Sequence, residues 1–284
     1  MNSSVLIWRT MKGFKISPYI LASILLMLLF SMMQMTRQSL SKPVHAQEQS
    51  QERKDYFYLP VGSANVSNVS EQDYRELITD FQSHYQSAVI QTTGMPLLIP
   101  NEWNSPYFTA FAIKRDTYMQ VSLWGGMARA PGFTKLQLAA ALCHEIGHVI
   151  AGEPRQTIPG SDWASTEGNS DFYAARVCLP DYLRRHPELA KTLVINARIQ
   201  HMCGANESCQ QVAQIGFDLV NSFQRYSYRE FTPVSLDVRA AAVTELVRNS
   251  YPTDQCRLDT FLAGASCQLG QQCHAPTCWL PAQQ

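Results

Sequence analysis

The chain lacks an excess of charge of either sign, because 23 Lys and Arg residues are balanced by 23 Asp and Glu residues. Proteins that bind nucleic acid usually present clustered positive charge to the phosphates, so we expect no nucleic-acid partner. The sequence also contains no internal repeat. Its 284 residues, 45% of them hydrophobic, instead provide enough apolar material for one globular domain with appendages.

Acidic residues are missing from the N-terminal segment, where none precedes Glu48. Basic residues stand there ahead of an apolar run over residues 19–33: Arg9, Lys12 and Lys15. This order is typical of a secretion signal or a signal anchor. We expect residues 1–46 to be a signal peptide ending at the small residue Ala46, or a signal anchor in which residues 19–33 form a single membrane span. Either outcome exports the rest of the chain to the periplasm or outside the cell.

Cysteine is also missing before Cys143, which excludes the lipidated cysteine of a lipoprotein start. Four of the eight cysteines lie in a C-terminal tail, residues 256–284, with little apolar content: Cys256, Cys267, Cys273 and Cys278. In an oxidising compartment we expect disulfides to staple this tail. The alternative is a second zinc site formed by Cys267, Cys273, His274 and Cys278, although the spacing matches no zinc-finger pattern.

Between the N-terminal segment and the tail, the patterns predict a polar linker over residues 47–69 and an α+β domain over residues 70–255. The β-structure falls within residues 97–127. Its strand Met119–Trp124 is either a core strand or an edge that pairs with an extended peptide. Helices are expected at 70–91, 135–151, 167–185, 188–201, 206–226 and 236–249.

The most informative motif of the chain is His144-Glu145-x-x-His148. Residues four apart lie on one face of a helix, so both imidazoles can reach one zinc ion while Glu145 flanks it. A structural zinc site uses four ligands and needs no base. Two histidines with a glutamate instead indicate a hydrolytic site, in which the carboxylate takes the proton of a water molecule.

The residues around the motif predict an apolar helix. Thr134 and Gln137 have the spacing of a capping box that starts a helix, and small or apolar residues then recur at helical spacing. Gly152 and Pro154 have the order that ends a helix. Polar histidine side chains on a buried helix need a binding partner, and a metal ion would be such a partner.

A third ligand is expected on the next helix, where Glu167 and Asp171 again lie four residues apart. Glu167 can return to the metal, and Asp171 can accept the free N–H of a ligand imidazole. The alternative is that these acidic residues only complement the dipole of their helix. If the two helices pack together, a bridge between Cys143 and Cys178 is geometrically attractive.

This combination, His144-Glu145-x-x-His148 with Glu167-x-x-x-Asp171, resembles the gluzincin class of zinc peptidases. Within that class, the segments from Phe108 and from Met119 are similar to the strand that precedes the metal helix in the HtpX and CAAX-prenyl-protease type. The resemblance implies a zincin-like fold, in which a small sheet packs on a mainly helical domain that carries the metal helix and a following ligand helix.

A further similarity is Tyr251-Pro252-x-x-x-x-Arg257, which resembles the family's H-P-x-x-x-x-R element. The family's His and Arg line the catalytic cleft, so the resemblance implies that Arg257 stabilises the oxyanion. Tyr251 and His201 are weaker candidates. The chain departs from the family in having Tyr251 where a His is usual, in reaching Glu167 much sooner after the metal helix, and in lacking the further membrane spans.

We therefore expect a zinc endopeptidase of the cell envelope or exterior that acts on a protein or peptide. Zinc is held by His144, His148 and Glu167, and Glu145 is the general base. The alternative is a non-catalytic, zinc-stabilised binding or scaffold module, which would have no need of the base. The sequence identifies no substrate-binding residues.

Overall fold

The computed structural model describes residues 58–64, 66–226, 233–270 and 273–282, and the chain divides into the units Met1–Gln51 and Glu52–Gln284. All described elements belong to the second unit. The expected signal segment, with its apolar run at 19–33, and linker residues 47–57 lie outside the described residues. Within the described ranges, no helix has both the length and the apolar character needed to cross a membrane.

The described unit is α+β, as predicted, with a three-stranded sheet in the order β1-β3-β2. The strands are β1 (Leu97–Leu98), β2 (Ala110–Lys114) and β3 (Met119–Leu123). β3 pairs in parallel with β1 and antiparallel with β2, and all five of its residues are buried. The hypothesis that this strand binds peptide at an open edge is therefore wrong, because both of its edges are already paired. β2 is the open antiparallel edge.

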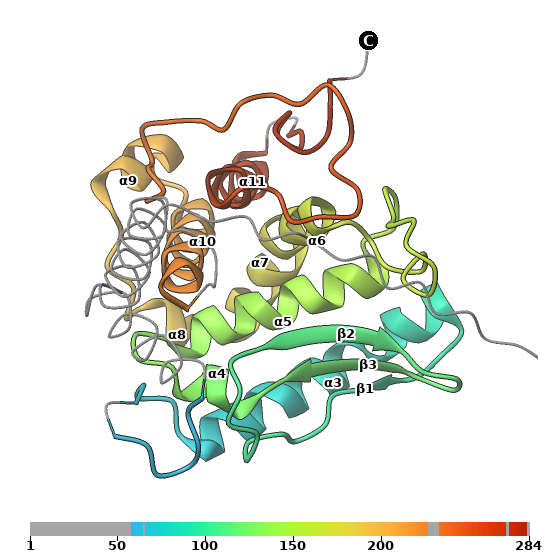
Figure 1. Ribbon diagram of the computed structural model, residues 1–284. Coiled ribbons are helices and arrows are strands. Elements are labelled where there is room, and N and C mark those ends of the chain that lie inside the picture. The colour runs from blue at the N-terminus through green and yellow to red at the C-terminus, as the bar shows by residue number, and fades with distance from the viewer. Residues whose placement is uncertain (1–57, 65, 227–232, 271–272, 283–284) are drawn as a thin grey trace, which may run out of the picture. The chain divides into compact units, whose positions relative to one another are not determined.

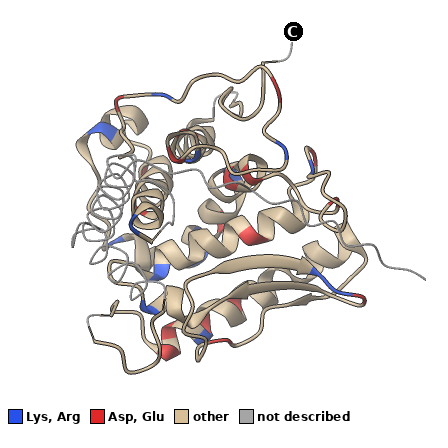
Figure 2. Cartoon of the chain, viewed as in Figure 1, with Lys and Arg blue, Asp and Glu red and all other residues tan. Residues whose placement is uncertain are grey.

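Capping boxes begin the two long helices that pack with the sheet. In α3 (Glu71–Thr93) the box joins Ser70 and Asp73, and in α5 (Lys135–Ile150) it joins Thr134 and Gln137. Each box satisfies backbone N–H groups that the first turn leaves free. α5 is predominantly apolar, and Lys135 and Glu145 are its only charged residues apart from its histidines (Figure 2).

α5 lies at the centre of the fold. The sheet and α3 pack on one side of it, as Figure 1 shows. On the other side pack α6 (Glu167–Tyr173), α7 (Leu179–Arg185) and α10 (Glu207–Tyr226). Fourteen of its sixteen residues are buried, which a helix between two layers requires. α11 (Asp254–Ser266) then covers α6 and α10.

The ligand helix forms where it was predicted, as α6 (Glu167–Tyr173), a π-helical turn η1 (Ala174–Cys178) and α7 (Leu179–Arg185). The predicted helix at 188–201 is instead two short helices, α8 (Pro187–Ala190) and α9 (Ala197–Cys203). Asn196 separates them, because its side chain caps α9 by accepting from the backbone N–H of Arg198. The remaining helices are α4 (Gly125–Arg129), α10 (Glu207–Tyr226) and the 3₁₀ turn η2 (Cys267–Leu269).

The predicted helix over residues 236–249 is wrong, since this stretch is irregular. Its backbone groups bond to distant partners rather than to each other. Ala240 N–H donates to the Asp259 carboxylate at 2.7 Å, and Val243 N–H and Val247 N–H donate to the carbonyls of Thr277 and Trp279. Tertiary hydrogen bonds therefore override the local helical pattern.

The C-terminal region also differs from its prediction. The expected boundary after residue 255 falls inside α11, whose Leu258 and Phe261 are fully buried in the main core. Residues 254–266 are therefore part of the helical core and not of a tail held by disulfides alone. The sequence does carry a signal for this helix, because Leu258, Phe261, Leu262 and Ala265 recur at helical spacing after the capping residue Thr253.

Every cysteine is in a disulfide: Cys143–Cys178, Cys203–Cys209, Cys256–Cys278 and Cys267–Cys273. Two predictions are thereby confirmed: disulfides hold the C-terminal segment, and a bridge joins Cys143 to Cys178. The alternative second zinc site is excluded, because the sulfur atoms of its three cysteines are bonded to other sulfurs. Four disulfides indicate an oxidising compartment.

Candidate metal centre

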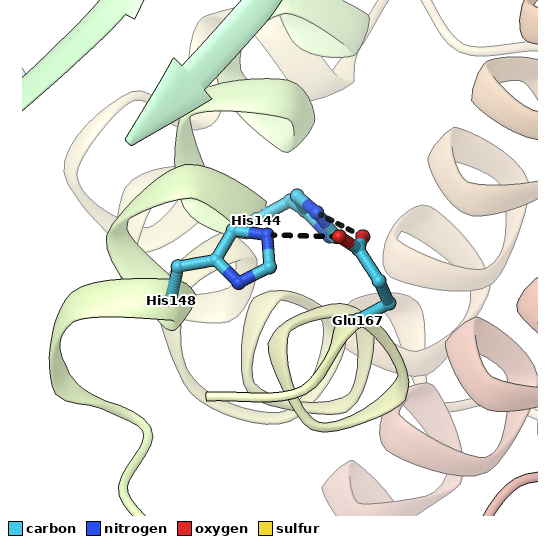
Figure 3. A group of neighbouring side chains, drawn as sticks. All are labelled: His144, His148 and Glu167. Carbon is cyan, nitrogen blue, oxygen red and sulfur yellow. Dashed lines mark ion pairs between the residues drawn. The ribbon is translucent and has the colours of Figure 1, made fainter. Parts of the chain in front are cut away.

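Three side chains from two helices converge at one point: His144 and His148 from α5, and Glu167 from the first turn of α6. One ligand atom from each lies within 4.8 Å of the others, and all three residues are buried. Figure 3 shows both imidazole rings turned toward the Glu167 carboxylate. The structure thus brings together the three residues predicted as ligands, in a group that could hold a metal ion.

His144 is oriented by a carboxylate behind it. Its Nδ1 lies 2.7 Å from Oδ1 of Asp171, and its Nε2 lies 3.2 Å from Oε2 of Glu167. Asp171 has no exposed surface and also accepts a hydrogen bond from Arg257. Its carboxylate is therefore ionised and accepts from the Nδ1–H of His144. Asp171 thus holds the ring of His144 with its Nε2 turned toward Glu167, which is the geometry expected of a residue that orients a metal ligand.

His148 is oriented by the backbone. Its Nδ1 lies 2.8 Å from the carbonyl oxygen of Ser165 and 3.0 Å from Oγ of Ser170. A carbonyl oxygen only accepts, so Nδ1 carries the hydrogen and Nε2 keeps a lone pair. That Nε2 lies 3.6 Å from Oε1 of Glu167.

The charges of the chain suit a cation at this point. Oε2 of Glu167 is buried and accepts no hydrogen bond from the described residues, and Nε2 of His144 lies 3.2 Å from it. Burial lowers the pKa of His144, but the Asp171 and Glu167 carboxylates outweigh it and raise that pKa to about 10. Burial lowers the pKa of His148 to about 4. The site thus demands positive charge, and its two imidazoles and one carboxylate are a donor set that fits a divalent metal.

Close packing of the two helices sets the spacing between the ligands. A Cβ atom on Gly147 would lie 2.9 Å from the Cα of Ser170, so a glycine is required where α5 and α6 touch. One residue before His144, Cys143 is bridged to Cys178 in the π-helical turn that continues α6, with 5.5 Å between their Cα atoms. The bridge and the glycine contact therefore fix α5 against the ligand helix.

Glu145 lies beside the three ligands but is not one of them. It is buried, and this burial raises the pKa of its carboxyl to about 7. Its side chain lines the same cleft as His148 and Glu167. A carboxylate in this position can exchange a proton with a molecule in the cleft near neutral pH.

Arg257 is placed behind Asp171. Its Nε donates to Oδ2 of Asp171 at 2.7 Å and its Nη2 donates to Oδ1 at 2.8 Å, a paired contact that holds the pKa of Asp171 well below its usual range. Arg257 is not among the residues that line the cleft. The structure therefore places it as a support for His144, acting through Asp171.

A cleft of about 170 Å³ opens beside His148 and Glu167, which line it together with Glu145. One wall is β2, which contributes Ala110, Phe111 and Ala112. The loop between His148 and Glu167, with Trp163, and Tyr251 also line the cleft. That loop is anchored by a reciprocal pair of hydrogen bonds between Thr157 and Asn249, each 2.8 Å long.

The two weaker candidates for oxyanion binding lie in different places. Tyr251 lines the cleft, and the guanidinium carbon of Arg257 lies 5.7 Å from the centre of its ring. His201 is exposed on α9 and is not among the lining residues. The structure thus places Tyr251 at the site and His201 outside it.

Sequence reasoning missed the residues that orient His148 and the aromatic wall of the cleft. Ser165 acts through its backbone carbonyl, which no side-chain pattern can reveal. Ser170 lies three residues after Glu167, on the face that meets α5, and helical spacing could have found it. Trp163 had no signal, because it lies in an irregular loop.

No protein-family model, curated protein or solved structure matches this chain. The geometry of the site is therefore what indicates a function.

Proposed function

We propose that this protein is an exported zinc endopeptidase with a zincin-like fold, in the manner of the gluzincins. One observation carries the proposal. Glu145, a buried carboxylate, lines the cleft beside three converging ligands without being needed as a ligand itself. A scaffold that used zinc only for stability would have no use for it, so the geometry favours a hydrolase.

Zinc bound by His144, His148 and Glu167 would lower the pKa of a water molecule and polarise the scissile carbonyl group. Glu145 takes the proton from the water and later delivers it to the leaving amine. Its carboxyl group is buried and lines the cleft, so it lies where both transfers would take place.

The negative charge that develops on the carbonyl oxygen requires a donor, and Tyr251 is better placed for it than Arg257. Tyr251 lines the cleft, whereas two donor nitrogens of Arg257 bond to Asp171. Arg257 lies against the ring of Tyr251 and also supports that side chain. We therefore assign oxyanion stabilisation to Tyr251 and the support of His144 to Arg257.

The substrate is an extended peptide that pairs with β2. Trp124 N–H donates to Thr109 O at one end of the β2–β3 ladder, and Arg115 N–H donates to Tyr118 O at the other end. Bonded pairs alternate in an antiparallel ladder, so Ala110 and Ala112 direct their N–H and C=O groups to the open edge. Both alanines line the cleft, and a peptide strand added there would pass Glu145.

The location of the protein is part of the same proposal. Four disulfides require an oxidising compartment, which fits the periplasm or the cell exterior. Residues 1–46 would act as the export signal, and residues 19–33 would act as the anchor if that segment is retained.

Replacement of the base tests the proposal directly. Glu145→Gln should retain one zinc per chain and the melting temperature of the wild type, but lose peptide hydrolysis by at least about a thousandfold, since the base acts only in the reaction. Metal analysis and cleavage of an unstructured protein such as casein measure the two effects. Glu188→Gln, which changes an exposed glutamate on α8, is the matched control and should retain full activity. Undiminished hydrolysis by Glu145→Gln would refute the mechanism.

A further inference from the structure

A tryptophan near the C-terminus occupies the space next to the third ligand. Gly168 directly follows Glu167, and a Cβ atom placed on it would lie 2.3 Å from Cδ2 and 2.5 Å from Cγ of Trp279. The indole ring therefore lies flat against the backbone of the first turn of α6. Trp279 is only 1% exposed, so this contact is part of the interior.

The tryptophan is held there by a disulfide and by backbone pairing. Cys278, the residue before it, is bridged to Cys256 on α11. The carbonyl of Trp279 accepts from Val247 N–H at 2.9 Å. The indole N–H finds no acceptor among the described residues. Packing and the neighbouring bridge, and not a hydrogen bond of the ring, therefore determine where the indole lies.

The same disulfide connects two supports of the metal centre. Each of its cysteines is followed by a residue that contacts α6: Cys256 by Arg257, which binds Asp171, and Cys278 by Trp279, which packs on Gly168. Phe172 of α6 completes a small apolar cluster with Cys256, Cys278 and Trp279. One covalent bond thus connects the two residues that contact α6 at Gly168 and at Asp171.

The ligand helix needs such support, because α6 is only seven residues long. A helix this short is not stable alone, and its position depends on what packs against it. α5 fixes one side of α6 through the contact between Gly147 and Ser170. Trp279 fixes the side near Gly168, one residue from the ligand.

We propose that Trp279 is a positioning residue of the metal centre, which holds the Glu167 carboxylate at the metal through Gly168 and is itself held by the Cys256–Cys278 bridge. The inference rests on the proposed zinc site and extends it to a segment more than a hundred residues away in the sequence. Trp279 touches neither metal nor substrate. Its effect is on the affinity and geometry of metal binding.

The test measures metal binding and not activity. The full chain and its variants are titrated with Zn²⁺ against a chromophoric chelator, and with Co²⁺, whose visible absorption reports the ligand geometry. We expect Trp279→Ala, and the double variant Cys256→Ala/Cys278→Ala, to weaken Zn²⁺ binding about 10- to 100-fold and to change the Co²⁺ spectrum. Trp279→Phe should recover much of the loss.

The matched control is Cys203→Ala/Cys209→Ala, which removes a bridge that links α9 to α10, far in sequence from α6. It should lower the melting temperature but leave Zn²⁺ affinity and the Co²⁺ spectrum unchanged. Equal loss of affinity in this control would show that any destabilisation weakens the site, and would overturn the proposal.

Gly168→Ala provides an independent test that keeps the tryptophan. The added methyl group should displace the ring or α6 and weaken Zn²⁺ binding in the wild type, yet have a smaller effect in the Trp279→Ala background, where the space is empty. Additive effects of the two changes, or wild-type affinity in folded Trp279→Ala, would overturn the inference. Failure of the zinc proposal is distinguishable, because the wild type itself would then bind no Zn²⁺.

Discussion

The two histidines of the metal centre are four residues apart on α5, but they are held in different ways. His148 is oriented by the backbone of Ser165 and by Ser170, which lie 17 and 22 residues away in the sequence. His144 is oriented by Asp171, which depends in turn on Arg257, 86 residues further along. One histidine therefore has a local, neutral support and the other a distant, charged support.

Because of this difference, removal of the two supports should cost different amounts of folding free energy. A buried ion pair that loses one member leaves an uncompensated charge, which costs about 3–5 kcal/mol of folding free energy. A neutral hydrogen bond contributes only about 0.5–1.5 kcal/mol. The side of the site at His144 should therefore be much more sensitive to substitution than the side at His148.

The largest effect is expected for Asp171→Asn. The change removes the charged acceptor of His144 and leaves the Arg257 guanidinium buried without its partner. We expect Zn²⁺ affinity to fall about 100-fold and the free energy of unfolding of the metal-free chain to fall by about 3–5 kcal/mol. Chelator competition and chemical denaturation measure these two quantities. Unchanged affinity would remove Asp171 from the support of His144.

A smaller effect is expected for Arg257→Ala, which leaves Asp171 in contact with His144. Stability should again fall by about 3–5 kcal/mol, but Zn²⁺ affinity should fall only about tenfold. Arg257→Lys should recover part of the loss, because a single ammonium cannot reproduce the paired contact with both carboxylate oxygens. If Arg257 instead acted on the oxyanion, kcat of the zinc-loaded protein would fall about a hundredfold with little change in stability. Steady-state kinetics on the same preparations decide between the two roles.

The smallest effect is expected for Ser170→Ala. His148 would keep its bond to the carbonyl of Ser165, so Zn²⁺ affinity should change less than about threefold and stability by about 1 kcal/mol. A loss as large as that of Asp171→Asn would show that the neutral support matters as much as the charged one. The comparison between the two histidines would then no longer hold.

The same contrast, between contacts that are local and contacts that are distant in the sequence, explains which features the sequence could predict. The metal helix and its capping box at Thr134 follow from short-range spacing. The three predicted ligands, His144, His148 and Glu167, lie in one group that could hold a metal ion. The position of Arg257 behind Asp171 could not be predicted, because it depends on how α11 packs on α6.

The features of the fold that the sequence did not predict correctly have a similar origin. Residues 236–249 have a helical pattern, but their backbone bonds to Asp259, Thr277 and Trp279, which local spacing cannot reveal. The sequence favours neither core nor edge for the predicted strand Met119–Trp124, because the alternation within a strand does not give the order of strands in a sheet. Whether the N-terminal segment is a signal or an anchor remains a prediction from composition.

The placement of Trp279 has a consequence for the order of events during synthesis. All three ligands leave the ribosome within a stretch of 24 residues, from His144 to Glu167, but Arg257 follows about 90 residues later and Trp279 later still. At roughly 5–20 residues per second, the nascent chain therefore has its ligands for several seconds before it has their distant supports. We expect tight metal loading to await the last part of the chain, so that an incomplete product, although it contains every ligand, holds its metal poorly.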